Sequence, residues 1–317
     1  MTSTPRIERA GPVARVWLDQ PEVRNALGGA LTAGRSAVRS RACCLLAAVL
    51  SAGAGAPRAQ EPAPAPREDV ISVTKPGLFD IHLEVTLFRP AGDGPFPLVV
   101  INHGKASGNP RFQERARYPL AAREFVRRGY AVVVPMRQGF AKSEGSYIGG
   151  GCNVASNGRV QAEDVEATIK TLATRADIDA RRVVVVGQSH GGLTALALGA
   201  LNLPNVVGLV NFAGGLRQEN CNGWEVTLAS ALAGYAKSTT VPSLWVYGDN
   251  DSYFPVAVWR EMFAQYVAAG GRARLVTVGR FGTDSHLLLA SANGVRIWLP
   301  EVDAFFRELG LPFEVKE

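Results

Sequence analysis

The stretch Gly187-Gln188-Ser189-His190-Gly191-Gly192 decides the fold of this 317-residue chain. It follows a valine-rich run at 182–186 that predicts a buried strand, and it precedes an apolar, small-residue segment at 193–201 that predicts a helix. A serine at such a strand-to-helix turn is held in a strained conformation that exposes its hydroxyl. Small residues are needed on both sides because the two backbones nearly meet there. The pattern predicts a nucleophilic Ser189 rather than a structural turn serine.

Strands and helices are predicted to alternate on both sides of this turn. Further apolar runs predict strands at 97–101, 130–134, 206–212, 242–247 and 272–278, and helical patterns occur at 119–128, 160–173, 255–269 and 299–309. Residues 71–73 and 81–88 alternate apolar and polar side chains, which is typical of half-buried antiparallel edge strands. We therefore expect an α/β fold with a mostly parallel, twisted sheet, helices on both faces, and loop insertions near 139–158 and 214–238.

The amino-terminal region differs in charge from the rest of the chain. The whole chain carries a net charge of +6, but the first 59 residues hold eight arginines and only three acidic residues, and the remainder is close to neutral. This distribution gives no support to nucleic-acid binding. Residues 35–56 combine arginines, a short apolar core and small residues, which predicts a secretory signal peptide. Residues 57–69 predict a Pro- and Ala-rich linker, and 70–317 predict one catalytic domain without a membrane span.

Residues 14–27 resemble the amino-terminal hairpin of enoyl-CoA hydratase (crotonase) proteins, but none of that family's later catalytic segments follow. An acyl-CoA hydratase is therefore a weak alternative, and export away from coenzyme A argues against it. We expect residues 1–34 to be a spurious or disordered head, with translation starting instead at Val38. Amino-terminal sequencing of the exported protein tests this hypothesis, and a mature chain that retains residues 16–27 would contradict it.

Two cysteines remain after the signal peptide, Cys152 and Cys221. Because an exported protein meets an oxidising compartment, the pair predicts a disulfide, with two unrelated thiols as the alternative. The expected location is the periplasm or the exterior. Neither these cysteines nor the four scattered histidines have the spacing of a metal site, and no metal or cofactor is expected.

A serine hydroxyl needs a base, and the base needs an orienting carboxylate. On this kind of sheet the chain order is serine, acid, histidine, and His286 is the one histidine that follows Ser189 at a distance. Asp251 is the favoured acid because it lies in the loop just past a predicted strand. Asp249 is the alternative, although we expect it to cap the turn, and Asp284 is a minor option because it is so close to the histidine in sequence.

The oxyanion of the intermediate needs two backbone N–H groups. The amide of His190 directly follows the nucleophile, and the second amide is expected from Lys105, with Gly104 allowing close approach. The side chain of His103 is expected to be structural, and His82 to be uninvolved. Five aromatic residues fall in loops near the expected mouth and are candidates for the substrate pocket, although core or lid packing is equally compatible with their positions: Tyr147, Trp224, Tyr253, Phe254 and Phe281.

These motifs together resemble the α/β-hydrolase superfamily over residues 70–312, in particular its dienelactone-hydrolase-like branch. The resemblance rests on the serine turn, the His103-Gly104 turn, and the loops at 248–251 and 281–286. Dienelactone hydrolases proper have a cysteine nucleophile where this chain has Ser189, which favours ordinary carboxylic esters over lactones. The stretch 137–145 also resembles the loop after the fourth strand of such hydrolases, where its role is mainly structural.

The sequence thus predicts a secreted serine hydrolase that cleaves a small-molecule ester through an acyl-enzyme intermediate. One alternative is a peptidase related to prolyl oligopeptidases, although the extra gating domain of those enzymes is not seen here. Another is a non-catalytic binding protein on a hydrolase scaffold, which would show an incomplete triad.

Overall fold

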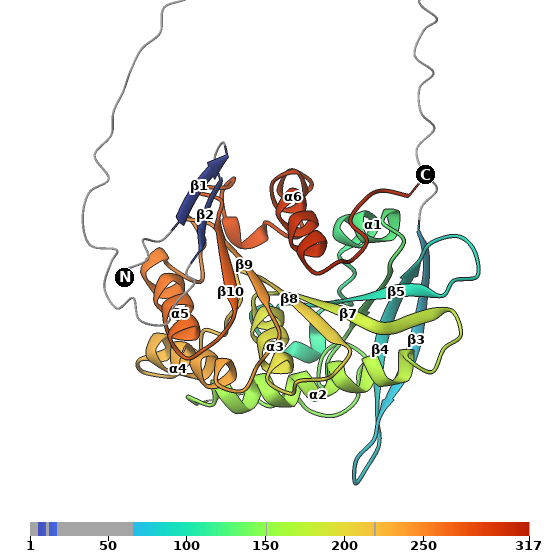
Figure 1. Cartoon of the computed structure of the whole chain (residues 1–317). Coiled ribbons are helices and arrows are strands. Elements are labelled where there is room, and N and C mark those ends of the chain that lie inside the picture. Colours follow the sequence, from blue (N-terminus) through green and yellow to red (C-terminus); the bar gives the residue numbers. More distant parts are fainter. Residues whose placement is uncertain (1–5, 11–12, 18–65, 150, 219, 317) are drawn as a thin grey trace, which may run out of the picture. The chain divides into compact units, whose positions relative to one another are not determined.

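The computed structural model describes residues 6–10, 13–17, 66–149, 151–218 and 220–316. Its strands form one sheet in the order β1-β2-β10-β9-β8-β7-β5-β6-β4-β3 (Figure 1). The central six strands are parallel and comprise β5 (Phe96–Asn102), β6 (Ala131–Pro135), β7 (Ile178–Gln188), β8 (Val206–Phe212), β9 (Ser243–Tyr247) and β10 (Ala273–Thr277). Parallel strands all end at the same edge, so the loops that follow them gather there.

The central parts of the parallel strands are apolar because both faces of the sheet are covered. In β5, Leu98 and Val100 belong to one core and Val99 and Ile101 to the other, and all four are completely buried. The continuous apolar runs in the sequence therefore gave the correct positions of these strands.

Helices cover both faces of the sheet, as predicted. The core on one face includes residues of α2 (Val154–Leu172), α3 (His190–Gly199), α4 (Trp224–Ala236) and α5 (Val256–Ala268). The core on the other face includes residues of α1 (Pro119–Arg127) and α6 (Ala292–Glu308) (Figure 1). Short 3-10 helices, η1 (Pro110–Phe112) and η2 (Ser285–Leu287), lie in the loops. In the part of the chain that the structure describes, no helix has both the length and the apolar character needed to cross a bilayer.

Antiparallel strands complete the sheet at both ends. The strands β3 (Arg67–Lys75) and β4 (Ile81–Arg89) pair with each other, and β4 pairs with β6, which confirms the two antiparallel strands predicted from the alternating pattern. The structure extends β3 to Arg67, three residues before the expected domain start. Asp69 explains part of this extension, because its carboxylate accepts a hydrogen bond of 2.6 Å from Arg89.

The amino-terminal segment differs from the expectation that residues 1–34 stand apart from the domain. The strands β1 (Arg6–Ala10) and β2 (Val13–Trp17) form an antiparallel hairpin, and β2 pairs with β10. The outer edge of β10 offers unpaired backbone groups, and a hairpin is an ordinary way to cover such an edge. The predicted signal peptide at 35–56 and the linker up to residue 65 lie outside the described residues.

Helices α2 and α6 begin well before their predicted starts, and α4 was not predicted. Helix α2 begins at Val154 instead of 160, although the sequence there contains Asn157 and Gly158, which disfavour helix. Packing explains the glycine, since a Cβ at Gly158 would lie 2.3 Å from the Tyr235 hydroxyl oxygen. Helix α6 begins at Ala292 instead of 299, because Ser291 caps it and Pro300 falls inside the helix. Helix α4 lies within a segment that was predicted to be a loop insertion.

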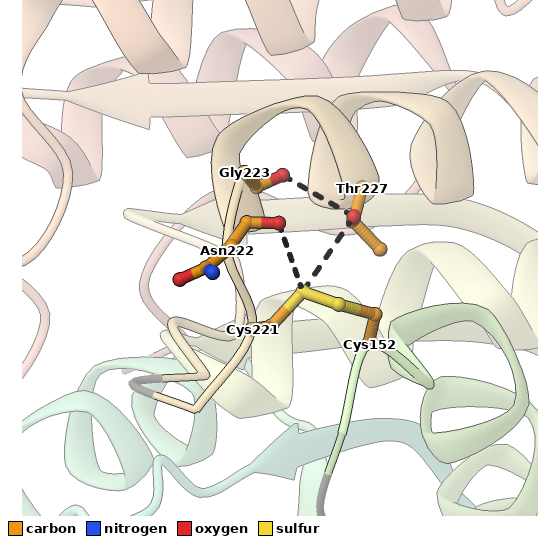
Figure 2. The surroundings of a disulfide bond; sticks show 5 residues. All are labelled: Cys152, Cys221, Asn222, Gly223 and Thr227. Carbon is orange, nitrogen blue, oxygen red and sulfur yellow. Dashed lines mark hydrogen bonds between the residues drawn. A yellow bond between two sulfur atoms is a disulfide. The ribbon is translucent and has the colours of Figure 1, made fainter.

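The predicted disulfide joins Cys152, just before α2, to Cys221, just before α4 (Figure 2). Cys221 is buried, whereas Cys152 is exposed. The Sγ atom of Cys221 lies 3.7 Å from the Thr227 hydroxyl, which donates to the Gly223 carbonyl at 3.2 Å (Figure 2). The bond therefore ties the loop before α2 to the first turn of α4.

We expect the double substitution Cys152→Ser/Cys221→Ser to lower the free energy of unfolding by about 2–4 kcal/mol, because the bond closes a long loop in the unfolded chain. The two cysteines are 69 positions apart. Urea unfolding of both proteins, with and without reductant, measures the effect. Reductant should destabilise the wild type and leave the double variant unchanged, and an equal response in both would contradict the assignment.

Candidate active site

Ser189 occupies a sharp turn between β7 and α3. Its φ of 55° and ψ of −124° lie in a region that residues with a side chain rarely adopt. The close approach of three segments forces this turn: a Cβ at Gly191 would come 2.1 Å from the Asn102 carbonyl oxygen, and one at Gly187 would come 2.0 Å from the Gly191 oxygen. The Ser189 amide donates to the Phe212 carbonyl at 3.0 Å, and the Ser189 carbonyl accepts from Gly215 at 2.9 Å. The strained serine is therefore fixed from both sides by backbone contacts.

His286 and Asp251 form a buried pair. Nδ1 of the imidazole lies 3.0 Å and 3.1 Å from the two carboxylate oxygens, and the side chain of Asp251 is completely buried. The same carboxylate accepts hydrogen bonds from the amides of Tyr253 at 2.8 Å and Phe254 at 2.9 Å. The carboxylate acts as the acceptor, so the imidazole proton sits on Nδ1 and the opposite nitrogen is left as a proton acceptor.

The other two carboxylates considered in the sequence have different positions. Asp249 is exposed, and its backbone amide donates to the Gly279 carbonyl at 2.7 Å. Asp284 accepts from the amide of His286 at 2.9 Å and from the Ser252 hydroxyl at 2.7 Å, which joins the loop that carries the imidazole to the loop that carries Asp251. Burial alone would raise the pKa of Asp284, but these hydrogen bonds outweigh it and lower the pKa.

The loop that carries the imidazole is also tied to the serine turn. The side-chain amide of Gln188, the residue just before Ser189, donates to the His286 carbonyl at 2.5 Å. Ser189 and His286 both line a cavity of about 560 Å³, which we call the histidine-side cavity. Side chains from β7, from the loop after β9 and from the loop after β10 are thus brought to one edge of the sheet.

The two expected oxyanion-hole segments also meet at Ser189. A Cβ at Gly104 would lie 3.3 Å from the serine Cβ, so this position passes directly beside the nucleophile. The Gly104 amide donates to the Tyr118 hydroxyl at 3.2 Å, so its N–H is already used. Gly104 therefore serves the site by leaving space beside the serine and not by donating a hydrogen bond to the oxyanion. Lys105 and His190 line a second cavity together with Ser189, of about 300 Å³, which we call the disulfide-side cavity.

A buried polar cluster lies behind these segments. It contains Arg137 and the rings of His103 and His190, all of which are at most 1% exposed. The guanidinium donates to the His103 carbonyl at 2.5 Å and to the Thr194 hydroxyl at 2.7 Å. Nε2 of His190 lies 2.6 Å from the Asn157 side-chain oxygen, which marks it as the protonated nitrogen. The prediction that His103 is structural agrees with these contacts, while His82 lies far from them on β4 beside Thr74.

Charges and burial set the protonation of this cluster. Burial, and next the neighbouring Arg137, hold the pKa values of His103 and His190 well below the ordinary histidine value. Burial lowers the pKa of Arg137 to about 10, and the charge of Asp164 offsets part of this effect. At neutral pH the cluster therefore combines two neutral imidazoles with one charged guanidinium.

The predicted aromatic residues divide between the cavities and the core. Tyr147, Tyr253 and Phe254 line the disulfide-side cavity, and Tyr253 also lines the histidine-side cavity, with its ring centroid 4.5 Å from that of His286. The other two differ from the prediction. Trp224 contacts Phe254, with ring centroids 6.2 Å apart, and Phe281 packs against the core that includes residues of α6. Neither forms part of the wall of these two cavities.

Comparison with known proteins supports the fold. The family model for X-Pro dipeptidyl-peptidase (S15 family) matches residues 80–220. The quorum-quenching protein AidA of Acinetobacter baumannii is 33% identical over 121 residues, which are 38% of this chain and 36% of that protein. The matched segment thus spans about a third of the length of that relative.

Two solved structures cover most of the chain. An esterase from Pyrococcus furiosus is 15% identical to this chain. The superposition covers 78% of this chain and 92% of the esterase chain, with a TM-score of 0.56. A putative dienelactone hydrolase from Klebsiella pneumoniae is 18% identical, covers 76% and 99%, and gives a TM-score of 0.54. The chain has the fold of the α/β hydrolases.

Several residues of this candidate site were not predicted from the sequence. Gln188 was quoted only as part of the turn, and Tyr118 and Arg137 act through contacts that come from distant segments. A glutamine between a glycine and the serine gives no sequence signal of its own. In the part of the chain that the structure describes, no group of three or more His, Cys, Asp or Glu residues is placed to hold a metal ion.

We expect the stability of this protein to fall as the pH decreases from 7 to 5.5. The unfolded chain takes up protons at His103 and His190 near pH 6.5, whereas the folded chain, with lowered pKa values, does not. Each histidine can contribute up to about 1.4 kcal/mol per pH unit below that value. Urea unfolding across this range measures the slope. His190→Gln should reduce it, and a flat profile in the wild type would contradict the two lowered pKa values.

Proposed function

We propose that this chain is an exported serine esterase that cleaves small carboxylic esters with Ser189, His286 and Asp251. The observation that carries the proposal is the strained serine facing the same cavity as an imidazole whose Nδ1 lies 3.0 Å from a buried carboxylate. A serine between glycines, a histidine base and an orienting acid, in that chain order, is the arrangement of acyl-transfer hydrolases on this fold. The disulfide and the signal-like pattern at 35–56 support export.

The first half of the reaction forms an acyl-enzyme. The Ser189 oxygen attacks the ester carbonyl carbon while Nε2 of His286 accepts the hydroxyl proton, and the carboxylate of Asp251 stabilises the resulting imidazolium. The carbonyl oxygen becomes an oxyanion held by the amides of Lys105 and His190. The His190 amide belongs to the first turn of α3, where backbone N–H groups lack helical partners and the helix dipole favours negative charge. The tetrahedral intermediate collapses as the imidazolium gives its proton to the departing alcohol.

The second half repeats the same steps with water. His286 removes a proton from a water molecule, the hydroxide attacks the acyl carbon, and the second intermediate expels the serine oxygen, which takes the proton back. The products are the carboxylic acid and the alcohol, and the enzyme is restored. These steps use only side chains and amides of the chain itself.

The positions of the two cavities support one orientation of the ester. His286 lines the histidine-side cavity and must reach the leaving oxygen, so the alcohol part belongs there. The acyl part then extends into the disulfide-side cavity, whose walls include Tyr147, Phe254 and Gln218. The loops on either side of the disulfide contribute Gly151 and Asn220 to the same cavity. At about 300 Å³ the acyl cavity is at the small end of ligand pockets, which favours short acyl chains.

Peptide cleavage is the second candidate, because the S15 peptidase model matches residues 80–220, which include the serine turn. The same acyl-enzyme chemistry cleaves amides, but an amide has a poorer leaving group and needs protonation of its nitrogen. Comparison of ester and amide substrates therefore separates the two candidates.

We expect p-nitrophenyl acetate and butyrate to be hydrolysed with a higher kcat/KM than the octanoate, a lactone or a proline-containing p-nitroanilide. Asp251→Asn should lower kcat by about 10⁴-fold, because the imidazole loses its orienting carboxylate. Initial rates at saturating and limiting substrate measure both effects.

The exposed neighbour Asp249 provides the matched control, and Asp249→Asn should retain wild-type kinetics. Equal losses in the two variants would exclude Asp251 as the specific acid. Rapid cleavage of the anilide with no turnover of the esters would instead support the peptidase.

A further inference from the structure

The buried guanidinium of Arg137 has no role in the mechanism described above, yet it touches both segments that supply the oxyanion amides. Arg137 follows β6 and is completely buried. One of its terminal nitrogens, Nη2, donates to the carbonyl of His103, whose chain continues into Gly104 and Lys105. The other, Nη1, donates to the Thr194 hydroxyl on α3.

The contacts on the α3 side lead directly to the residue after the nucleophile. The Thr194 hydroxyl donates to the His190 carbonyl at 2.9 Å, and Nη2 of Arg137 lies 3.3 Å from Nδ1 of the His190 ring. Since Nε2 of that ring donates to Asn157, Nδ1 is the acceptor and can receive the guanidinium proton. The backbone carbonyl of His190, through the Thr194 hydroxyl, and the His190 ring are thus both connected to the Arg137 guanidinium.

The contacts on the other side fix the turn at His103. Nδ1 of this ring lies 2.7 Å from the Gly104 carbonyl and must donate to it, while the Arg137 amide donates to Nε2 at 3.3 Å. The side chain and the backbone of Arg137 therefore both hold this turn. Lysine would keep the charge at this position, but it lacks the planar fork that reaches two segments at once.

The guanidinium is also a buried charge whose partners are neutral. Within the described residues, its hydrogen bonds go to a carbonyl, a hydroxyl and the Nδ1 atom of His190, and Nε has no partner. The carboxylate of Asp164 pairs with the Lys75 ammonium at 2.7 Å and accepts from the Gln138 amide at 2.8 Å. A buried cation without a directly bonded carboxylate is unfavourable in the resting protein, and an anion formed nearby would compensate it.

We propose that Arg137 is a positioning residue that locks the Lys105 and His190 amides in the geometry of the oxyanion hole and favours the negative charge that develops there. This assignment rests on the proposed function, because it concerns the same intermediate. The guanidinium acts through the two backbone segments and does not touch the substrate. It stabilises the transition state and leaves ground-state binding of the ester unchanged.

The test compares Arg137→Met and Arg137→Lys with the wild type, using p-nitrophenyl butyrate and an aryl trifluoromethyl ketone, whose hemiketal adduct with the serine carries an oxyanion. We expect Arg137→Met to lower kcat by about 10²–10³-fold, as removal of one oxyanion donor does, with KM changed less than about threefold. The inhibition constant of the ketone should rise by the same factor as kcat falls. Arg137→Lys should recover part of both losses.

A second buried arginine provides the matched control. Arg128 is 5% exposed and donates to Asp303 at 2.7 Å and 2.8 Å on the α1 and α6 side of the sheet. Arg128→Met should lower the melting temperature and leave kcat and ketone binding unchanged. If Arg137→Met does not fold, Arg137→Lys carries the same comparison, with an intermediate loss expected.

Three results would overturn the assignment. Wild-type kcat and ketone affinity in a folded Arg137 variant would show that the guanidinium does not act on the oxyanion, and a rise in KM alone would place its effect on substrate binding. An equal loss of kcat in the Arg128 control would make the effect one of general stability. Absence of ester turnover in the wild type would instead refute the proposed function, and this assignment with it.

Discussion

The close approach of three backbone segments at Ser189 is the constraint on which the rest of the site depends. The end of β7, the start of α3 and the turn after β5 come so close that any side chain at Gly187 or Gly191 would collide with a carbonyl oxygen. A serine held there at positive φ cannot withdraw its hydroxyl into the fold. Because the second half of β7, from Val183 to Gln188, is buried and α3 is buried along its whole length, packing of the core supplies the stability that keeps the strained residue in place.

Hydrogen bonds between loops then bring the remaining groups to the serine. Gln188 reaches the loop of His286, and Asp284 joins that loop to the segment that carries Asp251. Each loop follows a different parallel strand, so the sheet fixes where the loops start and side-chain contacts fix where they end. The site combines a rigid nucleophile on the sheet with an acid and base on loops that are held by a few polar contacts.

Much of this arrangement could be predicted from the sequence, and the limits have physical causes. The serine turn, the His286–Asp251 contact and the Cys152–Cys221 bond follow from local patterns and chain order, which a single sequence displays directly. The start of α2 could not be predicted, because Gly158 is a poor helix former that is selected for contact with Tyr235, a residue far along the chain. Trp224 and Phe281 were misplaced for the same reason: an aromatic residue in a loop gives no signal of whether it faces a cavity or the core. The pairing of β2 with β10 was not predicted either, since it joins segments that are far apart in the sequence.

The contacts of the buried polar cluster behind the site could not be predicted from chain order. Arg137, His103 and His190 come from three different segments and are all buried, so their roles depend on contacts rather than on local pattern. Two neutral imidazoles and one guanidinium form a connected network between the sheet and the nucleophile. Such a network is costly to bury unless its members are well satisfied, and here it links the two segments that flank the serine.

The most direct measurement of the central claim is covalent labelling with a fluorophosphonate, followed by peptide mass spectrometry. The account predicts one phosphonate adduct, located on Ser189, and no adduct in a folded Ser189→Ala variant. Ser107, an exposed serine that also lines the disulfide-side cavity, provides the comparison, and Ser107→Ala should label at the wild-type rate. Undiminished labelling of Ser189→Ala, or an adduct on another residue, would contradict the account.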